Sequence, residues 1–358
     1  MDKPAIVLLN LGSPDSTAVP DVRRYLRQFL SDERVLDAPA PIRWMVLNLF
    51  ILPFRPAQSA EAYRRIWTDA GSPLIVTSQR QQQLLQEKIA APVLLGMRYG
   101  QPSTPSVVAQ LKAMGATRVY LIPLYPHYAM SSYETALVAM TEEMTRQGLD
   151  IPYTIRAPFY DEPTYIDALL ASTEGDRADP FDYWLFSFHG VPERHLRKGD
   201  PSRAHCLTCE NCCEVAHPVH AVCYRHQCLE TAKAFAARAG LPEGKWGVSF
   251  QSRLGRDPWL TPYTDATLEA LGERGLKRVK VMCPAFITDC LETLEEIAME
   301  GAEEFREAGG GQLDLVPCLN DHPAWMDLLA DWSQTWLDAA EPSRASPFAQ
   351  MEKEAAAG

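Results

Sequence analysis

The chain has 358 residues, more than one hydrophobic core usually serves, so two domains are expected. Its formal net charge of −12, with no basic run to offset it, argues against nucleic acid as a partner. The chain begins "MDKP" and enters an apolar run at once, which leaves no room for a secretory signal, so we expect a cytoplasmic protein without disulfides.

Short apolar runs alternate with amphipathic stretches along the chain. The runs expected to form buried strands are residues 5–12, 91–100, 118–126, 183–190, 245–252, 278–286 and 313–320. Stretches with a helical period lie between them, at 106–116, 131–148, 164–174 and 264–275. This alternation predicts an α/β protein in which helices flank parallel sheets and ligands bind beyond the carboxyl ends of the strands.

The pattern falls into two halves. We expect an N-terminal α/β domain over residues 1–150 and a C-terminal α/β domain over 151–321. The helical stretch 322–337 is expected to pack back on the first domain, and the composition of 338–358 is typical of a disordered tail. The "NLGSP" turn has a single glycine, so it does not predict a dinucleotide site.

One segment, Trp44 to Phe54, is strongly apolar and is flanked by Arg43 and Arg55. Eleven residues are too few to cross a bilayer, which needs about 20. Two interpretations stay open: a buried helix, or an exposed apolar patch that contacts a membrane or a hydrophobic substrate.

Two features are able to do chemistry at the strand ends. His189 directly follows an apolar run, where a histidine is placed to accept protons. Glu292, Glu296 and Glu300 are each four residues apart, which stacks three carboxylates along one side of a helix. The row suits a divalent cation or a proton path, and a solvated acidic face is the alternative.

These residues lie within motifs that together resemble the ferrochelatase family, the enzymes that insert ferrous iron into a porphyrin. The resemblance runs from about residue 5 to 336, and the motif sequences are most similar to those of the proteobacterial branch. It takes in "LLNLGSP", "YRRIWTDAGSPL", "MRYG", "PLYPHY", "SFHGVPERHLRKGDP", "FQSRLGRDPWLTPYT" and "CPAFITDCLETLEEI".

The resemblance implies two similar flavodoxin- or Rossmann-like domains, each a parallel sheet flanked by helices, with the active site in the cleft between them. It implies that Fe²⁺ enters protoporphyrin IX to give protohaem, the last step of haem biosynthesis. His189 and Glu292 match the catalytic pair, Asp289 joins them around the substrate iron, and Glu296 and Glu300 match an acidic metal or proton path. The residues expected to bind the porphyrin are Leu11, Arg55, Tyr63, Ser72, Arg98 and Phe286.

One departure is Cys290, where animal members have histidine. Other functions stay open: a chelatase-fold enzyme for coproporphyrin III or another tetrapyrrole or metal, or a non-catalytic haem or cluster sensor. The apolar segment fits protoporphyrin, which is membrane-soluble. The resemblance therefore also implies a transient contact with a membrane surface, peripheral on the inner face of the cytoplasmic membrane.

A cysteine-rich segment interrupts the family pattern at residues 202–226. Six of the nine cysteines of the chain lie between His205 and Cys228, and Cys228 stands where the pattern resumes. The cysteines inside the insertion are Cys206, Cys209, Cys212, Cys213 and Cys223.

Their spacing suits thiolate ligation in a short loop. Some microbial members of the family resemble this pattern and hold a [2Fe–2S] cluster, which makes Cys206, Cys209 and Cys213 the favoured ligands, with Cys212 or Cys223 as the fourth. Structural zinc, completed by His205, His217 or His220, is the alternative, and unligated thiols are a third. Cys283, Cys290 and Cys318 are expected to be core or pocket residues.

Overall fold

A computed structural model describes residues 2–253, 255 and 257–339 of the chain. The described chain forms two compact units, with residues 2–125, 130–157 and 329–339 in the first and 126–129 and 158–328 in the second. From residue 340 onward, the predicted tail lies outside the described residues.

A four-stranded parallel sheet forms the centre of the first unit, in the order β2-β1-β3-β4. The strands are β1 (Pro4–Asn10), β2 (Val93–Met97), β3 (Arg118–Pro123) and β4 (Tyr153–Ile155). Every residue of β2 and β3 is buried, because helices cover both faces, and such strands appear as continuous apolar runs. The sequence did not predict β4, since three residues, of which only Ile155 is buried, are too few to produce a pattern.

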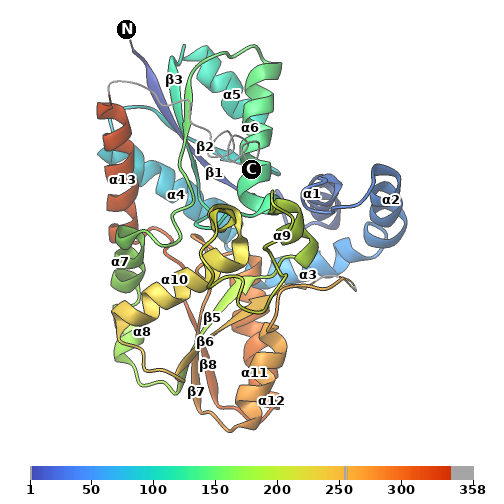
Figure 1. Ribbon diagram of the computed structural model, residues 1–358. Coiled ribbons are helices and arrows are strands. Elements are labelled where there is room, and N and C mark those ends of the chain that lie inside the picture. Colours follow the sequence, from blue (N-terminus) through green and yellow to red (C-terminus); the bar gives the residue numbers. More distant parts are fainter. Residues whose placement is uncertain (1, 254, 256, 340–358) are drawn as a thin grey trace. The chain divides into compact units, whose positions relative to one another are not determined.

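The first unit has helices beside this sheet and others farther from it (Figure 1). They are α1 (Val19–Ser31), α2 (Ala40–Met45), η1 (Val46–Ile51), α3 (Arg55–Ile66), α4 (Pro73–Lys88), α5 (Thr104–Ala113), η2 (Met130–Glu134) and α6 (Thr135–Arg146). Helices α1 to α5 all carry proline at the first or second position. Proline fits there because the first N–H groups of a helix have no partner within it.

The edge strand β4 is covered by the end of α13 (Pro323–Asp338). The ring of Trp336 stacks on Tyr120 with centroids 5.3 Å apart, and its indole N–H donates to Oγ1 of Thr154 at 2.9 Å. The guanidinium of Arg118 lies 4.5 Å from the centroid of the same ring and donates to the carbonyls of Trp336 and Leu337. These contacts attach the last turns of α13 to the first sheet.

The second unit repeats the same architecture with the parallel order β6-β5-β7-β8. Its strands are β5 (Tyr183–His189), β6 (Trp246–Gln251), β7 (Arg278–Met282) and β8 (Gln312–Val316). Its helices are α7 (Pro163–Ser172), α8 (Glu174–Ala178), α9 (Glu193–Gly199), η3 (Pro218–Val222), α10 (Tyr224–Ala239), α11 (Thr264–Glu273), η4 (Glu292–Gly301) and α12 (Ala302–Glu307). In Figure 1, α11 and α12 lie on one side of this sheet and α7, α8 and α10 on the other.

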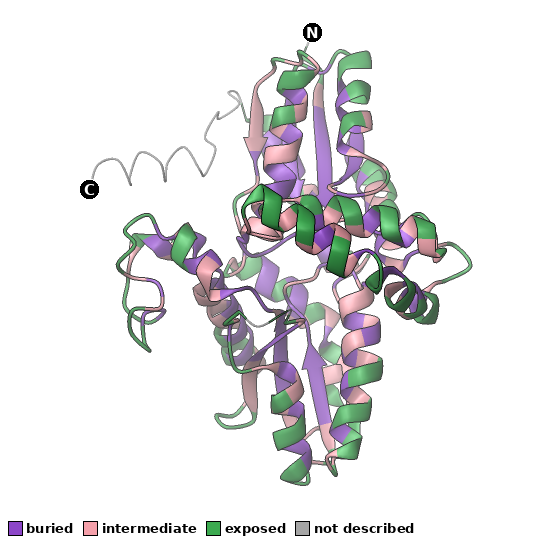
Figure 2. Cartoon of the chain, turned by 90° about the vertical axis from the view of Figure 1, so that its right-hand side faces the viewer, coloured by how far each residue is buried: buried purple, intermediate pink, exposed green. Residues whose placement is uncertain are grey.

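Burial follows the layers in both units. Figure 2 shows the long strands almost wholly buried and the helices with exposed outer faces. In the second unit, Leu185 of β5 and Val281 of β7 pack against Leu268, Ile297 and Phe305 of the covering helices. The predicted fold class, parallel α/β sheets flanked by helices, is confirmed.

Candidate active site

His189 is the last residue of β5, at the carboxyl edge of the second sheet, and it is paired in register with Gln251 of β6. Its Nδ1 lies 2.6 Å from the carbonyl oxygen of Gly190. Because a carbonyl only accepts, this contact requires the proton on Nδ1 and leaves the lone pair on Nε2. The hydroxyl of Tyr224 donates to the carbonyl of His189 at 2.9 Å, and the ring of Phe286 meets the imidazole edge-on at 6.4 Å.

The acidic row lies on a π-helix, η4, where the sequence predicts an ordinary helix. A π-helix bonds residue i to i+5 and has a wider turn than an α-helix, so residues four apart come closer to alignment along one side. Glu292 and Glu296 are partly buried and Glu300 is exposed, which makes the row lead from the interior to the surface. Helices of this kind are rare and are frequently found at functional sites.

Glu296 is electrostatically linked to the other predicted catalytic residues. Burial raises its pKa, the hydroxyl of Ser252 opposes this by donating to Oε2 at 2.5 Å, and His189 lowers the pKa while Glu292 raises it. His189 and Glu292 therefore each lie within electrostatic range of Glu296. Ser252 has a φ of +66°, an uncommon conformation for a side-chain-bearing residue.

The start of η4 is held by the end of β6. The amide of Gln251 donates to the carbonyl of Glu292 at 2.8 Å, and its oxygen accepts from the hydroxyl of Ser187 at 2.7 Å. Gln251 and Ser252 were not predicted as site residues. The signal was present, because both lie in the polar "FQSR" segment that ends a predicted strand.

Asp289 has other partners in the structure. Its Oδ2 accepts from the amide of Asn320 at 2.6 Å and its Oδ1 from the hydroxyl of Thr293 at 3.0 Å. The backbone N–H of Asp289 in turn donates to Oδ1 of Asn320 at 2.9 Å. These bonds fix the turn that precedes η4, so any metal ligation by Asp289 would have to replace or share them.

Of the residues expected to bind porphyrin, Phe286 lies beside His189 in the second unit and the others belong to the first. Leu11 and Arg98 follow β1 and β2, and their strands continue side by side because Tyr99 donates its N–H to the carbonyl of Leu11 at 2.8 Å. Tyr63 is buried edge-on against Tyr25, with ring centroids 6.5 Å apart. Ser72 is buried at the start of α4, whereas Arg55 is exposed at the start of α3.

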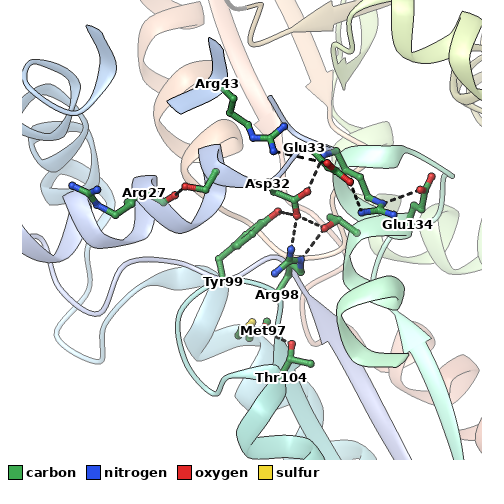
Figure 3. Close-up of polar contacts among 12 residues, drawn as sticks. Arg27, Asp32, Glu33, Arg43, Met97, Arg98, Tyr99, Thr104 and Glu134 are labelled. Carbon is green, nitrogen blue, oxygen red and sulfur yellow. Dashed lines mark hydrogen bonds and ion pairs between the residues drawn. The ribbon is translucent and has the colours of Figure 1, made fainter. Parts of the chain in front are cut away.

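Arg98 has a charged partner in the structure. Figure 3 shows its guanidinium paired with Asp32, and the Nη2–Oδ2 distance is 2.5 Å. Asp32 was not a predicted site residue, because no spacing in the sequence links it to a residue 66 positions away.

The apolar segment is an exposed patch and not a buried helix. Trp44 is 63% exposed, Phe50 62% and Phe54 73%. The underside of the segment packs inward through Leu47 and Leu52. The exposed apolar patch comprises Ile42, Trp44, Met45, Leu49, Phe50 and Phe54. Among the helices of the described residues, none combines the length and hydropathy needed to cross a membrane.

In the cysteine-rich insertion, Cys206, Cys212, Cys213 and Cys223 are buried, whereas Cys209 is exposed. Thiol hydrogen bonds link Cys223 to Cys206 and to Cys213, and Cys213 to Cys212. The bond to Cys206 raises the pKa of Cys223 to about 12, with burial acting in the same direction and the bond to Cys213 opposing it.

Asp200 organises the start of this loop by accepting from the backbone N–H groups of His205 and Cys206, each at 2.9 Å. The histidines offered for zinc stack on other imidazoles: His205 on His217 at 4.0 Å, and His220 on His226 at 3.7 Å. Within the described ranges, no group of three or more His, Cys, Asp or Glu side chains has the arrangement of a metal site.

Comparison with known proteins identifies the family. The ferrochelatase family model matches residues 3–336. Ferrochelatase from Opitutus terrae is 53% identical over 343 residues, covering 95% of this chain and 99% of its own. Ferrochelatase from Pseudomonas aeruginosa is 52% identical over 334 residues, covering 93% and 98%.

Among solved structures, SirB from Bacillus subtilis with Fe³⁺ covers 93% of this chain and 94% of its own at 11% identity, with a TM-score of 0.52. At that identity the likeness concerns the fold alone. The near full-length family match, together with relatives that share half of the residues, shows that the chain belongs to the ferrochelatase family.

Proposed function

We propose that this protein is a ferrochelatase that inserts Fe²⁺ into protoporphyrin IX to give protohaem. The observation that carries the proposal is the grouping of His189 with Glu292 and Glu296 of a π-helix at the carboxyl edge of the second sheet. Family membership supports the same conclusion.

The reaction needs proton acceptors and iron ligands near the ring. Two pyrrole N–H protons leave the porphyrin as one Fe²⁺ enters, so the charge of the macrocycle is conserved. We assign proton acceptance to Nε2 of His189, since Nδ1 is held by the carbonyl of Gly190. Carboxylate oxygens are ligands that Fe²⁺ accepts alongside imidazole, so Glu292, with Asp289 nearby in sequence, is assigned to the substrate iron.

Glu296 and Glu300 form the path between this site and solvent. Burial raises the pKa of Glu296, so its carboxyl group holds a proton more readily than a solvated carboxyl group does, as a proton carrier requires. Glu300 is exposed, where a hydrated cation enters or a proton leaves.

The porphyrin is assigned to apolar and cationic groups. Leu11, Tyr63 and Phe286 offer apolar surface to the ring. For its carboxylates, Arg55 offers a cation, Arg98 an N–H donor and Ser72 a hydroxyl donor. Binding energy from the ring periphery can favour a distorted macrocycle whose nitrogens face the metal.

The decisive test is haem formation by the purified protein, followed by absorption under anaerobic conditions. His189→Ala is expected to abolish insertion of Fe²⁺ while free-base porphyrin still binds, as followed by its fluorescence. A wild-type protein that binds porphyrin without inserting iron would contradict the proposal and favour a sensor. Faster turnover with coproporphyrin III than with protoporphyrin IX would identify coproporphyrin III as the substrate.

We also propose that the exposed apolar patch makes a transient contact with the inner face of the cytoplasmic membrane. Side chains such as Trp44, Phe50 and Phe54 are too exposed to stabilise the fold much, and together they form an apolar surface beside the exposed cation of Arg55.

Flotation with anionic liposomes tests this contact. A Phe50→Ser/Phe54→Ser variant should lose liposome binding and keep its thermal midpoint. Val215→Ser is the matched control, because Val215 is also exposed but lies outside the patch. Equal binding by both variants would refute the membrane contact.

For the cysteine-rich insertion we propose a [2Fe–2S] cluster held by Cys206, Cys212, Cys213 and Cys223. All four thiols are buried, and hydrogen bonds connect them in a row from Cys206 through Cys223 and Cys213 to Cys212. Cys209, one of the ligands favoured from the sequence, is exposed and becomes the weaker candidate, and the four thiols would have to move together to surround a cluster. The bound group would cross-link the loop, since iron insertion is redox-neutral and requires no electron carrier. The thiols must lose their protons on binding.

Anaerobic purification followed by iron and acid-labile sulfide analysis tests the cluster. Visible absorption bands should vanish in Cys206→Ser and persist in Cys209→Ser. A colourless protein with about one zinc would instead establish the structural zinc alternative.

A further inference from the structure

Asp32, a buried carboxylate in the first unit, forms an ion pair with Arg98. Asp32 follows the end of α1, and its side chain is only 4% exposed. Its Oδ2 accepts from Nη2 of Arg98 at 2.5 Å, from the hydroxyl of Tyr99 at 2.9 Å and from the hydroxyl of Thr135 at 2.5 Å (Figure 3). Its Oδ1 accepts the backbone N–H of Arg34 at 2.8 Å. One carboxylate thus joins α1, the end of β2 and the start of α6.

Thr135 completes a closed triangle with the ion pair. Its Oγ1 accepts from Nε of Arg98 at 2.8 Å while its own proton goes to Asp32. The guanidinium therefore has two fixed acceptors, which define its plane, and the ring of Tyr99 lies 4.5 Å from its central carbon. In the part of the chain that the structure describes, Nη1 of Arg98 has no hydrogen-bond partner, and the side chain is 25% exposed.

The pair remains ionised at neutral pH. Burial would raise the pKa of Asp32, but the bond from Thr135, the backbone N–H of Arg34 and the charge of Arg98 together hold this pKa below its usual value. Arg98 itself follows β2 beside Leu11, at the carboxyl edge where parallel sheets bind ligands.

We propose that Asp32 is a positioning residue for a substrate carboxylate. Together with Thr135 it fixes the guanidinium of Arg98, so that Nη1 donates to a carboxylate of the bound porphyrin. Because Asp32 already balances the charge of Arg98, recognition depends on the direction of the N–H group and not on net positive charge. The inference rests on the proposed function, since it concerns the same substrate.

Asp32→Asn tests the inference directly. The amide can turn its oxygen toward either the three donors or the N–H of Arg34, and its NH₂ group then faces a donor on the other side. In either orientation the charged acceptor that fixes the plane of Arg98 is lost. We expect KM for protoporphyrin IX, and its Kd from fluorescence titration, to rise about tenfold while kcat stays within about twofold, because a bond to a charged group carries at least that much affinity. In an Arg98→Ala background the same substitution should change neither constant further.

Variants at Thr135 separate positioning from folding. Thr135→Val removes the hydroxyl at nearly equal volume and should raise KM, whereas Thr135→Ser keeps the hydroxyl and should restore it. Tyr99→Phe removes one donor to Asp32 without touching the acceptors of Arg98, so its KM should stay within about twofold. If Asp32→Asn does not fold, the comparison of KM between Thr135→Val and Thr135→Ser tests the positioning role instead.

An unchanged or lower KM in both Asp32→Asn and Thr135→Val, or effects that add fully to Arg98→Ala, would overturn the positioning role. Failure of the proposed function looks different, since the wild-type protein would then form no haem at all.

Discussion

Replacing Lys280 with methionine should leave the second unit nearly as stable as before, whereas replacing it with alanine should not. Lys280 lies in the middle of β7, and its side chain is 2% exposed. Its ammonium reaches Asp176 at 3.3 Å, Asp179 at 3.4 Å and Asp314 at 3.8 Å. The residue thus combines a buried aliphatic stem with a charge that meets three carboxylates.

The two contributions differ in size. Alanine removes about three buried methylene groups, each worth ~0.8 kcal/mol, and leaves a cavity, so the loss should be about 2–4 kcal/mol. Methionine keeps the volume and loses only the charge. The side chains of Asp176 and Asp179 are 25% and 56% exposed, and Asp314 keeps Arg278 at 2.7 Å, so the carboxylates stay compensated. The cost of Lys280→Met should therefore stay within about 1 kcal/mol.

Urea unfolding monitored by tryptophan fluorescence measures both variants, since Trp184 is fully buried and pairs in register with Lys280. A Lys280→Met variant as unstable as Lys280→Ala would refute this reasoning, because the charge and not the stem would then carry the stability.

Three further predictions concern the second unit. Phe305→Ala should destabilise it by about 3–5 kcal/mol in the same assay, because a fully buried ring leaves a cavity, and exposed Met299→Ala should cost far less. Ser252→Ala removes a hydrogen bond that lowers the pKa of Glu296, so this pKa should rise and the acid limb of the pH–rate profile should move to higher pH. An acid limb that does not move would show that Glu296 is not part of the proton path. Burial opposes the lowered pKa of Asp200, but bonds from the hydroxyl of Ser202 and from the backbone N–H groups of Ser202, His205 and Cys206 hold it at about 2. The stability that Asp200 gives the cysteine loop is therefore complete above about pH 4 and disappears as the pH falls toward 2. Hydrogen exchange of residues 201–213 in wild type and Asp200→Asn should therefore differ at pH 7 and converge near pH 2, and equal exchange at pH 7 would contradict the role of Asp200.

The strands were the most predictable feature of this protein. Seven apolar runs became strands. In β1, β2, β3, β5 and β7 nearly every residue is buried, because a strand covered on both faces must be apolar along its whole length, whereas β6 and β8 are only partly buried. The eighth, β4, has three residues and leaves no such trace. The position of His189 followed from the same reasoning, since the end of a buried run is the edge of the sheet.

Local patterns did not decide the environment of each run. The segment from Trp44 to Phe54 is as apolar as a strand, yet its outer side chains are exposed, and only the packing of Leu47 and Leu52 shows which side faces inward. The spacing of the glutamates likewise fits an α-helix and a π-helix, because both have a turn near four residues.

Sequence alone determined the α/β class, the candidate catalytic histidine, the acidic row and the cysteine cluster, because each depends on residue type and short spacing. Tertiary structure decided the partners: Asp32 for Arg98, Ser252 for Glu296, Asn320 for Asp289, and Cys223 for Cys206 and Cys213. The partners in the first three of these pairs are separated by 66, 44 and 31 positions, and contacts at such separations arise only when strands and helices pack, so no local pattern encodes them.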